Sequence, residues 1–385
     1  LIMIHSMKDA PLKNKNIVIR LDLNVPVQDG KVTDTTRIDR VKPTIDTLRE
    51  SGVAKITILS HFGRPKGEEK PEFSLGFLPP VLSRCWGVDV GFGPDTAEKI
   101  TLLENLRFSP GEEENDPNFA KELAVHGDIY INDAFSVSHR AHASVEAITK
   151  FLPSYAGLNL HKEIDALEKA LSTPKRPVAA IIGGAKVSSK LSLIKNLLPK
   201  MDMIVLGGGM ANTFFLAEGH DVGKSLAEAD MTAEAKSILT EAKAQNCEII
   251  LPMDGLMAKE FAKGADYRET SIDNIANDEM MLDIGTQSAE MIKEKLGAAK
   301  TVLWNGPMGA FEIPPFDHGT VAVARYVAAR TKSGDVLSIG GGGDTVSALS
   351  HAGVSDDFSY ISTAGGAFLE WLEGKTLPGI AALDR

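Results

Sequence analysis

The chain has 385 residues, of which 43% are hydrophobic and 24% charged, with a formal net charge of −11. This length predicts two globular domains of about 150–200 residues each, and the acidic charge argues against a nucleic-acid or anionic-membrane partner. Cys85 and Cys247 lie far apart and form no CxxC motif, which argues against a disulfide framework and a cysteine zinc site and favours a reducing compartment.

Short apolar runs alternate with helix-like stretches along the whole chain. Several runs are continuously Val, Ile and Leu, as expected of strands buried on both faces of a sheet. The strand-like runs are Ile17–Leu23, Lys55–Ser60, Ile129–Asn132, Val178–Ile182, Met203–Leu206, Glu248–Leu251, Thr301–Trp304 and Val336–Ile339. Lys186–Leu198 and Asp230–Ala244 are long and periodic enough for helices. The alternation predicts an α/β fold with two doubly wound, Rossmann-like parallel sheets.

The domain boundary is expected near a helical pattern that follows Pro153. This pattern places Ile164, Leu167 and Ala170 on one face, and Pro174 stops it. We predict an N-terminal domain over 1–160, an interdomain helix over 161–173 and a C-terminal domain over 174–365. Residues 366–385 are expected to return to the N-terminal domain. The alternative is one more crossover helix inside a single large domain.

Polar or glycine-rich segments follow almost every strand-like run, and ligands of open α/β sheets bind beyond the carboxyl ends of the strands. Arginine and histidine dominate these segments in the N-terminal half: Arg20–Pro26, Ser60–Pro65, Glu104–Phe108 and Asn132–His142. Glycine dominates in the C-terminal half: Gly183–Lys186, Gly207–Met210, Asn305–Gly309, Gly340–Thr345 and Ser362–Gly366. The first set suits a compact polyanion and the second a nucleotide, so transfer between them requires the halves to face each other across a cleft.

Other patterns have plainer interpretations. A glycine pair after a strand is usually a tight turn, and His139 and His142 lack a third ligand for a metal. Glu112–Glu114 is expected to be a solvated loop. Gly219–Ser225 resembles a P-loop but has one residue too few between its glycines and follows no strand-like run. The absence of a GxGxxG motif disfavours an NAD-dependent dehydrogenase.

Nine segments, taken together and in order, resemble the motifs of phosphoglycerate kinases. They run from about residue 12 to residue 380 and comprise Arg20–Pro26, Ser60–Pro65, Glu104–Phe108, Ser138–His142, Gly183–Lys190, Gly207–Met210, Trp304–Glu312, Gly341–Thr345 and Ser362–Ala367. The resemblance implies reversible phosphoryl transfer in glycolysis, from 1,3-bisphosphoglycerate to ADP, giving 3-phosphoglycerate and Mg-ATP. It also implies a cytoplasmic monomer that binds these small molecules and no nucleic acid or membrane.

The resemblance also assigns residues. By similarity, the phosphoglycerate would be held by Asp22, Asn24, Arg37, His61, Arg64, Arg107 and Arg140. The nucleotide would be bound by Lys186, Lys190, Gly208, Asn305, Glu312, Gly342, Gly343, Asp344 and Thr345, with Glu312 at the ribose and Asp344 near Mg²⁺. We expect the transferring phosphoryl group to be contacted by Arg37, Lys186 and the N–H groups around Gly343 and Gly366.

The chemistry of the acceptor sets the expected mechanism. A carboxylate is ionised at neutral pH and needs no general base, so Asp22 is interpreted as a ligand of a substrate hydroxyl. Positioning and charge neutralisation should carry the catalysis. Two departures from the family pattern are Ala364, where another glycine is common, and the short stretch Gly91–Thr101, which puts a surface helix in doubt. A non-catalytic nucleotide-binding protein remains the alternative, although Arg37, Lys186 and Asp344 are all present.

Overall fold

The computed structural model describes residues 3–384, and these divide into two compact units. Unit 1 contains the described residues up to Asp165 together with those from Thr376 onward, and unit 2 is Ala166–Lys375. Helix α6 (Leu158–Leu171) crosses this division. The C-terminal return begins at Thr376 instead of residue 366, because α13 (Gly366–Leu372) packs against α7 (Val187–Leu197) of unit 2.

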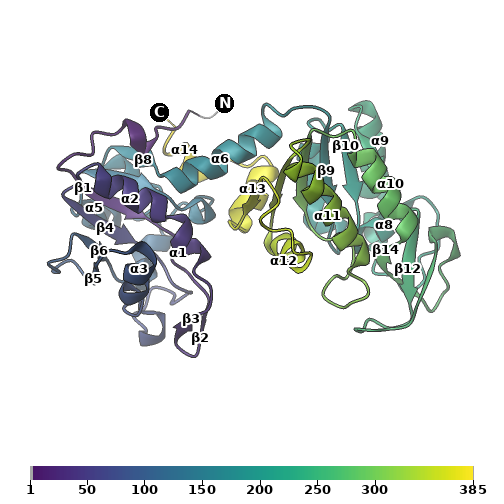
Figure 1. Cartoon of the computed structure of the whole chain (residues 1–385), viewed down its shortest axis with the longest axis horizontal. Coiled ribbons are helices and arrows are strands. Elements are labelled where there is room, and N and C mark those ends of the chain that lie inside the picture. The colour runs from purple at the N-terminus through teal and green to yellow at the C-terminus, as the bar shows by residue number, and fades with distance from the viewer. Residues whose placement is uncertain (1–2, 385) are drawn as a thin grey trace. The chain divides into compact units, whose positions relative to one another are not determined.

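Unit 1 is built on a six-stranded parallel sheet (Figure 1). Its strand order is β5 (Val90–Phe92), β6 (Ile100–Leu102), β4 (Lys55–Leu59), β1 (Asn16–Arg20), β7 (Ile129–Asn132) and β8 (Ser154–Ala156). A small hairpin joins β2 (Val27–Gln28) to β3 (Lys31–Val32). The helices are α1 (Thr36–Arg40), α2 (Lys42–Glu50), α3 (Pro79–Trp86), α4 (Pro110–Glu113), α5 (Pro117–Ala124) and α14 (Pro378–Ala381). Short 3₁₀ helices span Met7–Asp9, Pro71–Phe73, Leu106–Phe108, Phe135–Val137 and Ala147–Lys150.

Strand β1 shows why this sheet is apolar on both faces. Ile17 and Ile19 belong to the core formed with α1, α2 and α3, whereas Val18 packs in the core formed with α5. Successive side chains of a strand point to opposite faces, so a strand covered on both sides must be apolar at every position. The continuous apolar run that predicted this strand therefore has a direct structural cause.

Unit 2 has a second six-stranded parallel sheet. Its order is β11 (Glu248–Ile250), β10 (Met203–Leu206), β9 (Val178–Ile182), β15 (Thr301–Asn305), β16 (Leu337–Gly341) and β17 (Tyr360–Ser362). A three-stranded antiparallel sheet has the order β13 (Tyr267–Ser271), β12 (Asp254–Ala258), β14 (Met280–Ile284). The remaining helices are α8 (Gly209–Ala217), α9 (Thr232–Ala244), α10 (Thr286–Leu296), α11 (His318–Lys332) and α12 (Gly343–His351), with 3₁₀ helices at Ala229–Met231 and Ile272–Asn274.

Each strand-like run of the sequence corresponds to a strand, but several strands had no clear signal. β5, β6, β8 and β17 are three residues long, too short to show a hydrophobic pattern. The antiparallel sheet was also not predicted, because β13 is largely exposed and polar. The short stretch after β5 holds no helix: residues 93–99 connect β5 directly to its parallel neighbour β6.

The start of α6 is anchored by a buried carboxylate. Asp133 Oδ1 accepts a hydrogen bond from the Leu160 N–H at 2.9 Å, and Oδ2 accepts one from the Thr44 hydroxyl at 2.6 Å. Burial raises the pKa of Asp133 to about 6, although these hydrogen bonds oppose the rise. Gly157 is needed beside it, since a Cβ there would lie 2.2 Å from Asp133 Oδ1. The helix that crosses the two units is thus tied to the end of β7 and to α2.

Among the described residues, no helix combines the length and apolar character needed to cross a membrane.

Candidate active site

The carboxyl ends of β1, β4, β6 and β7 carry the basic segments of unit 1, and these strands are neighbours in the sheet. Asp22 and Asn24 follow β1, and Arg37 lies on α1. The Arg37 guanidinium contacts Asp22 Oδ1 at 3.2 Å and donates to the Asn24 carbonyl at 2.8 Å. The Ser136 hydroxyl donates to Asp22 Oδ2. These contacts hold Arg37 at the sheet edge with its side chain 34% exposed.

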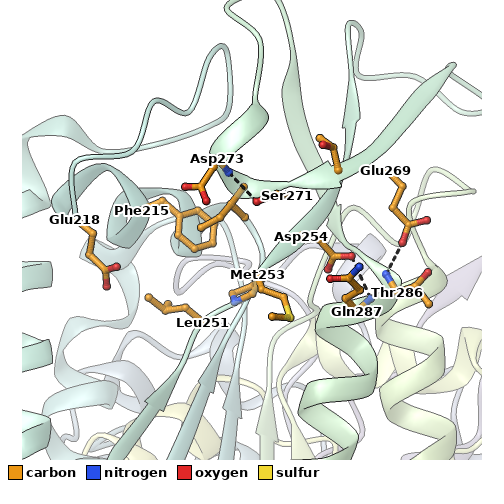
Figure 2. A pocket seen from close by; sticks show the side chains of 13 residues that line it. Phe215, Glu218, Leu251, Met253, Asp254, Glu269, Ser271, Asp273, Thr286 and Gln287 are labelled. Atoms are coloured by element: carbon orange, nitrogen blue, oxygen red, sulfur yellow. Dashed lines mark hydrogen bonds between the residues drawn. The ribbon is translucent and has the colours of Figure 1, made fainter.

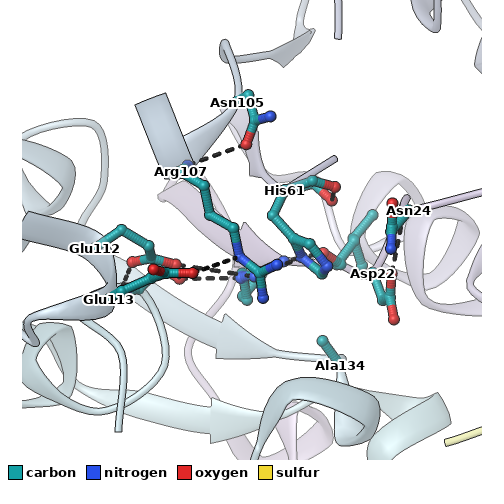
Figure 3. Close-up of polar contacts among 12 residues, drawn as sticks. Asp22, Asn24, His61, Asn105, Arg107, Glu112, Glu113 and Ala134 are labelled. Carbon is teal, nitrogen blue, oxygen red and sulfur yellow. Dashed lines mark hydrogen bonds and ion pairs between the residues drawn. The ribbon is translucent and has the colours of Figure 1, made fainter. Parts of the chain in front are cut away.

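Arg107 is connected to Asn24 through Gly63, in the loop that follows β4. The Gly63 N–H donates to Asn24 Oδ1 at 3.1 Å, and Arg107 donates to the Gly63 carbonyl at 3.0 Å. Glu113 Oε1 lies 3.6 Å from Arg107 Nε, so a carboxylate holds this arginine from the opposite side. The backbone of Arg107 is fixed by Asn105 Oδ1, which accepts its N–H at 3.0 Å (Figure 3). Two segments therefore hold the side chain of Arg107, and Asn105 holds its backbone.

Arg64 and Arg140 complete the basic group and are both exposed. Arg107 interacts electrostatically with Arg64, and His142 with both Arg107 and Arg140. Burial and these positive charges lower the pKa of His142 to about 4, so its ring is neutral at pH 7. Among the described residues its Nδ1 is buried without a hydrogen-bond partner. Accumulated positive charge and an unpaired buried nitrogen are features of an anion-binding site.

Asp22 and His61 lie within this positive field. Burial alone would raise the pKa of Asp22, but its interactions with His61 and Arg37 and the hydrogen bonds from the Ser136 hydroxyl and the Asn24 N–H outweigh it, and the pKa is lowered. Burial, and then the charges of Arg20, Arg107 and Arg37, hold the pKa of His61 well below its usual range. The site therefore presents an ionised Asp22 and a neutral His61 at pH 7. All seven residues predicted for the phosphoglycerate belong to this one connected group, the basic cluster, with Arg20 and His142 beside them.

The interpretation of Glu112–Glu114 as a solvated loop is wrong for Glu112. Its side chain is fully buried, and Oε2 lies 3.9 Å from Arg20. Glu112 also accepts hydrogen bonds from the N–H and the hydroxyl of Ser144, at 2.8 and 2.6 Å. Three consecutive glutamates indicate a charged surface, and only the fold shows that the first of them points inward to a buried arginine.

The glycine loops of unit 2 follow β9, β10, β15, β16 and β17, and several of them touch one another. A Cβ on Gly183 would lie 1.9 Å from the Pro307 carbonyl oxygen, and one on Gly306 would lie 2.2 Å from the Gly183 oxygen. A Cβ on Gly208 would lie 2.6 Å from the Gly184 oxygen, and Gly208 has a φ of +70°. These glycines are required for backbone-to-backbone packing between loops.

Two helix N-termini differ from this pattern. Gly342 and Gly365 are the N-caps of α12 and α13, with φ of 96° and 57°, and neither helix has a side-chain cap. A Cβ on Gly343 or Gly365 would meet nothing within 4 Å. The start of each helix therefore has room for a ligand to approach, as a phosphate site at a helix N-terminus requires. Gly366, the first residue of α13, is exposed. Ala364 does not need to be glycine, because the positive φ falls on Gly365.

The N-terminus of α7 is arranged differently. Glu228 accepts hydrogen bonds from the Ser188 N–H at 3.1 Å and from its hydroxyl at 2.5 Å, so a carboxylate already caps this helix. Lys186, the N-cap residue, is exposed and interacts electrostatically with Glu228. This loop therefore offers a ligand the exposed ammonium group of Lys186, because Glu228 already occupies the N–H of Ser188. Glu228 had no signal in the sequence, because it lies 40 residues away.

Buried polar contacts tie Lys190, Asn305 and Thr345 together. Lys190 donates to Asn305 Oδ1, and Asn305 Nδ2 donates to the Gly341 carbonyl at 2.8 Å. The Thr345 hydroxyl accepts the Gly306 N–H at 2.7 Å, and its side chain is buried. Burial lowers the pKa of Lys190, while Asp344 and Glu373 act against this shift. The side chains of Asn305 and Thr345 therefore support the loops after β15 and β16.

A cavity of about 660 Å³ lies within unit 2 beside these loops. Its lining includes Gly208, Glu312 and Asp344, three of the predicted nucleotide residues. Its apolar wall was not predicted and consists of Leu226, Phe261, Met280, Met281, Leu282, Pro307, Met308 and Phe311. Leu226 and Phe261 are more than half exposed, although they are large apolar residues. An apolar wall with few polar groups at one end suits a flat heterocycle that carries phosphates.

The segment that resembles a P-loop has a structural role. Gly219–Ser225 follows helix α8 instead of a strand. A Cβ on Gly223 would lie 2.3 Å from the Ala276 oxygen, so this glycine serves packing. Lys224 nevertheless lines the nucleotide-sized cavity.

A larger cavity in unit 2, of about 820 Å³, has different chemistry (Figure 2). Its lining contains Glu218, Asp254, Glu269 and Asp273 and no lysine or arginine. Asp254 and Glu269 accept the N–H groups at the start of α10, at 2.6 to 3.1 Å. Acidic side chains repel phosphates, so the smaller cavity beside the glycine loops is the better nucleotide site.

A basic cluster in unit 1 and a separate nucleotide-sized cavity beside an uncapped helix N-terminus in unit 2 are the arrangement expected of a phosphotransferase with two substrates. The family model described as phosphoglycerate kinase matches residues 7–375. The chain therefore belongs to the phosphoglycerate kinase family. It is a kinase of glycolysis that transfers a phosphoryl group between 1,3-bisphosphoglycerate and ADP, with a carboxyl group as the acceptor in the reverse direction.

Curated relatives and solved structures agree with this assignment. The chain is 55% identical over 391 residues to a phosphoglycerate kinase of Rhodospirillum centenum, covering 98% of each chain. It is 53% identical over 387 residues to one of Sinorhizobium medicae, covering 97% of each. The structure of phosphoglycerate kinase from Coxiella burnetii superposes with a TM-score of 0.93 at 40% identity over 99% of each chain. That from Pyrococcus horikoshii gives 0.80 at 31% identity over 98% of each.

Proposed function

We propose that the basic cluster of unit 1 binds 3-phosphoglycerate or 1,3-bisphosphoglycerate and that the 660 Å³ cavity of unit 2 binds ADP or ATP. The observation that carries this division is the difference in chemistry between the two sites. Unit 1 offers arginine forks, which bind carboxylate and phosphate bidentately. Unit 2 offers an apolar wall and uncapped helix N-termini, which suit a base and its phosphates.

The transfer itself needs no proton acceptor. In the direction of ATP consumption, a carboxylate oxygen of 3-phosphoglycerate attacks the γ-phosphorus as the bond to the bridging oxygen of ADP breaks. Both oxygens are anionic, so no proton moves. Asp22, ionised and paired with Arg37, orients a substrate hydroxyl and takes no part in proton transfer. The barrier is instead the repulsion between two anions, which positive charge must offset.

Arg37 and Lys186 supply that charge at the transferring group. NH1 of Arg37 contacts Asp22 and Asn24, which leaves the rest of the fork for the phosphoryl oxygens. Lys186 is exposed beside the glycine loop after β9, and the N–H groups at Gly343 and Gly366 add backbone donors. Because these groups belong to different units, we propose that the units close on each other during the cycle and exclude water from the acyl phosphate.

Asp344 is the proposed protein ligand of Mg²⁺. Among the described residues no three His, Cys, Asp or Glu side chains are grouped as a metal site. We propose that this one carboxylate acts together with phosphate oxygens and water. Mg²⁺ is commonly held in this way in kinases. Asp344 is exposed at the first turn of α12 and lines the cavity, which fits the role. Bound Mg²⁺ would neutralise charge on the nucleotide phosphates. We further propose a cytoplasmic monomer that acts on small molecules alone.

Hydrogen exchange measured by mass spectrometry tests the division of substrates. With 3-phosphoglycerate alone, we expect slower exchange in peptides that contain Asn24 and Gly63. With ADP alone, we expect slower exchange in peptides that contain Gly208 and Gly309. Sulfate at equal ionic strength is the control for unspecific anion binding. Protection of the same unit by both ligands would contradict the proposed division.

Replacing Asp344 with asparagine tests the metal role. The Mg²⁺ concentration for half-maximal rate should rise about tenfold, because a neutral amide is a weaker ligand than a carboxylate. Affinity for ADP measured in EDTA should stay within twofold. Asp335→Asn removes the same charge from an exposed position after α11 and should leave both values unchanged. Equal loss of ADP affinity with and without Mg²⁺ would show that Asp344 acts on the nucleotide directly.

A further inference from the structure

A buried ion pair lies behind the basic cluster and is not explained by substrate contact. Arg20, the last residue of β1, and Glu112, on α4, are both 0% exposed. Two charges removed from water are costly unless hydrogen bonds satisfy them. Arg20 donates to the Ser144 hydroxyl at 2.9 Å and to the Leu21 carbonyl at 2.5 Å. Glu112 accepts hydrogen bonds from the N–H and the hydroxyl of Ser144. The backbone of Ser144 is held in turn by the Tyr130 hydroxyl at 2.7 Å.

A third donor of Arg20 is directed at His61. Arg20 NH2 lies 2.9 Å from His61 Nδ1. A guanidinium has only donors, so Nδ1 must accept this bond through its lone pair. The ring hydrogen then resides on Nε2, the nitrogen for which residues 3–384 give no hydrogen bond. An accepting Nδ1 also requires a neutral ring, in agreement with the low pKa of His61 caused by burial and by Arg20.

We propose that Arg20 and Glu112 are positioning residues that hold His61 as the Nε2–H tautomer, so that it donates a hydrogen bond to the bound phosphoglycerate. The inference rests on the proposed binding of phosphoglycerate to unit 1. Anionic substrate oxygens have only acceptors, so a ring with its lone pair on Nε2 would repel them. The charge on Glu112 offsets that of Arg20, and both are bridged by Ser144, which fixes the direction of the guanidinium.

The ligand-free enzyme gives the first test. ¹⁵N-detected spectra of histidine-labelled protein, assigned with His61→Gln, should show His61 with an unprotonated Nδ1 and a protonated Nε2 near pH 7. The same spectra of the double variant Arg20→Gln/Glu112→Gln should show an increased share of the Nδ1–H tautomer, because a glutamine amide can either donate or accept. The double variant avoids leaving one buried charge unpaired.

Kinetics give the second test. Arg20→Gln/Glu112→Gln should raise KM for 3-phosphoglycerate about tenfold, the loss expected for one hydrogen bond to a charged group. KM for ATP should change less than twofold. In a His61→Leu background the same double substitution should raise KM for 3-phosphoglycerate less than twofold, because the donor that it positions is already absent.

A matched control uses the ion pair of Arg268 and Glu279, which lies in unit 2 with NH2 and Oε1 2.7 Å apart. Arg268→Gln/Glu279→Gln removes the same charges and should leave KM for 3-phosphoglycerate unchanged. A wild-type His61 with the hydrogen on Nδ1, or a full tenfold loss in the His61→Leu background, would overturn the positioning role alone. A His61→Leu enzyme that binds 3-phosphoglycerate normally would instead overturn the proposed substrate site, whatever the tautomer.

Discussion

Replacement of Arg37 with alanine is expected to lower kcat by about 10³-fold in a coupled assay with 3-phosphoglycerate and Mg-ATP, the scale of an arginine that stabilises a transferring phosphoryl group. The guanidinium contacts Asp22 and the Asn24 carbonyl and is one-third exposed, so its charge is held where an anion can reach it. The affinity for ADP, measured by calorimetric titration, should stay within twofold, because Arg37 belongs to unit 1.

Two further variants test whether the effect depends on the position and the shape of the Arg37 side chain. Arg40→Ala removes an equal charge from the same helix, α1, and should retain kcat within twofold. Arg37→Lys keeps the charge but loses the bidentate fork, so it should recover only part of the rate. If ADP affinity fell as much as kcat in Arg37→Ala, the assignment of separate substrates to the two units would be incorrect.

The second large effect is expected from Gly183→Ala. The new Cβ would lie 1.9 Å from the Pro307 oxygen and 2.6 Å from its carbonyl carbon, and neither backbone atom can move as a side chain would. The loops after β9 and β15 must separate, which displaces two sides of the nucleotide site. We expect ADP affinity to fall about 100-fold and the free energy of unfolding to drop by about 1–3 kcal/mol, as for other overpacked sites.

Calorimetric titration and urea unfolding measure the two quantities. Affinity for 3-phosphoglycerate should be retained, because its proposed site lies in unit 1. Gly76→Ala is the control: the nearest atom to its Cβ would be the Ser74 hydroxyl oxygen at 3.3 Å, and no backbone atom would lie as close as in Gly183→Ala. Normal ADP binding by Gly183→Ala would show that the contact between these two loops is not needed for the nucleotide site.

The strands that could be predicted from the sequence are those whose own residues form a continuous apolar run. β1, β4, β9 and β10 lie inside a sheet covered on both faces, so most of their positions are apolar and the run is visible. β8 and β17, at the sheet edges, are three residues long and leave no pattern. β13 is exposed, and its pairing with β12 depends on chain segments that only the fold brings together.

The same distinction holds within the candidate site. The arginines and glycines that follow strands could be predicted to lie together, because the carboxyl ends of parallel strands meet at one edge of the sheet. The roles of individual glycines could not: Gly183 and Gly306 serve packing, whereas Gly343 has open space around it. Glu112 was assigned to the surface because its neighbours Glu113 and Glu114 are charged, yet its partner is Arg20, 92 residues earlier. Glu228 also needed the fold to be noticed, as did the position of Lys224 in the lining of the 660 Å³ cavity.

The sequence by itself determined the α/β class, the order of the motifs and the resemblance to phosphoglycerate kinases, because these depend on residue types at short spacing. The tertiary structure alone decided which polar groups are buried, which helix N-termini are open and which carboxylates hold the arginines. The physical reason is that burial and hydrogen-bond pairing arise between residues far apart in the chain. Arg20, Glu112 and His61 are the clearest case: they lie in three separate segments, and only the fold brings their side chains together.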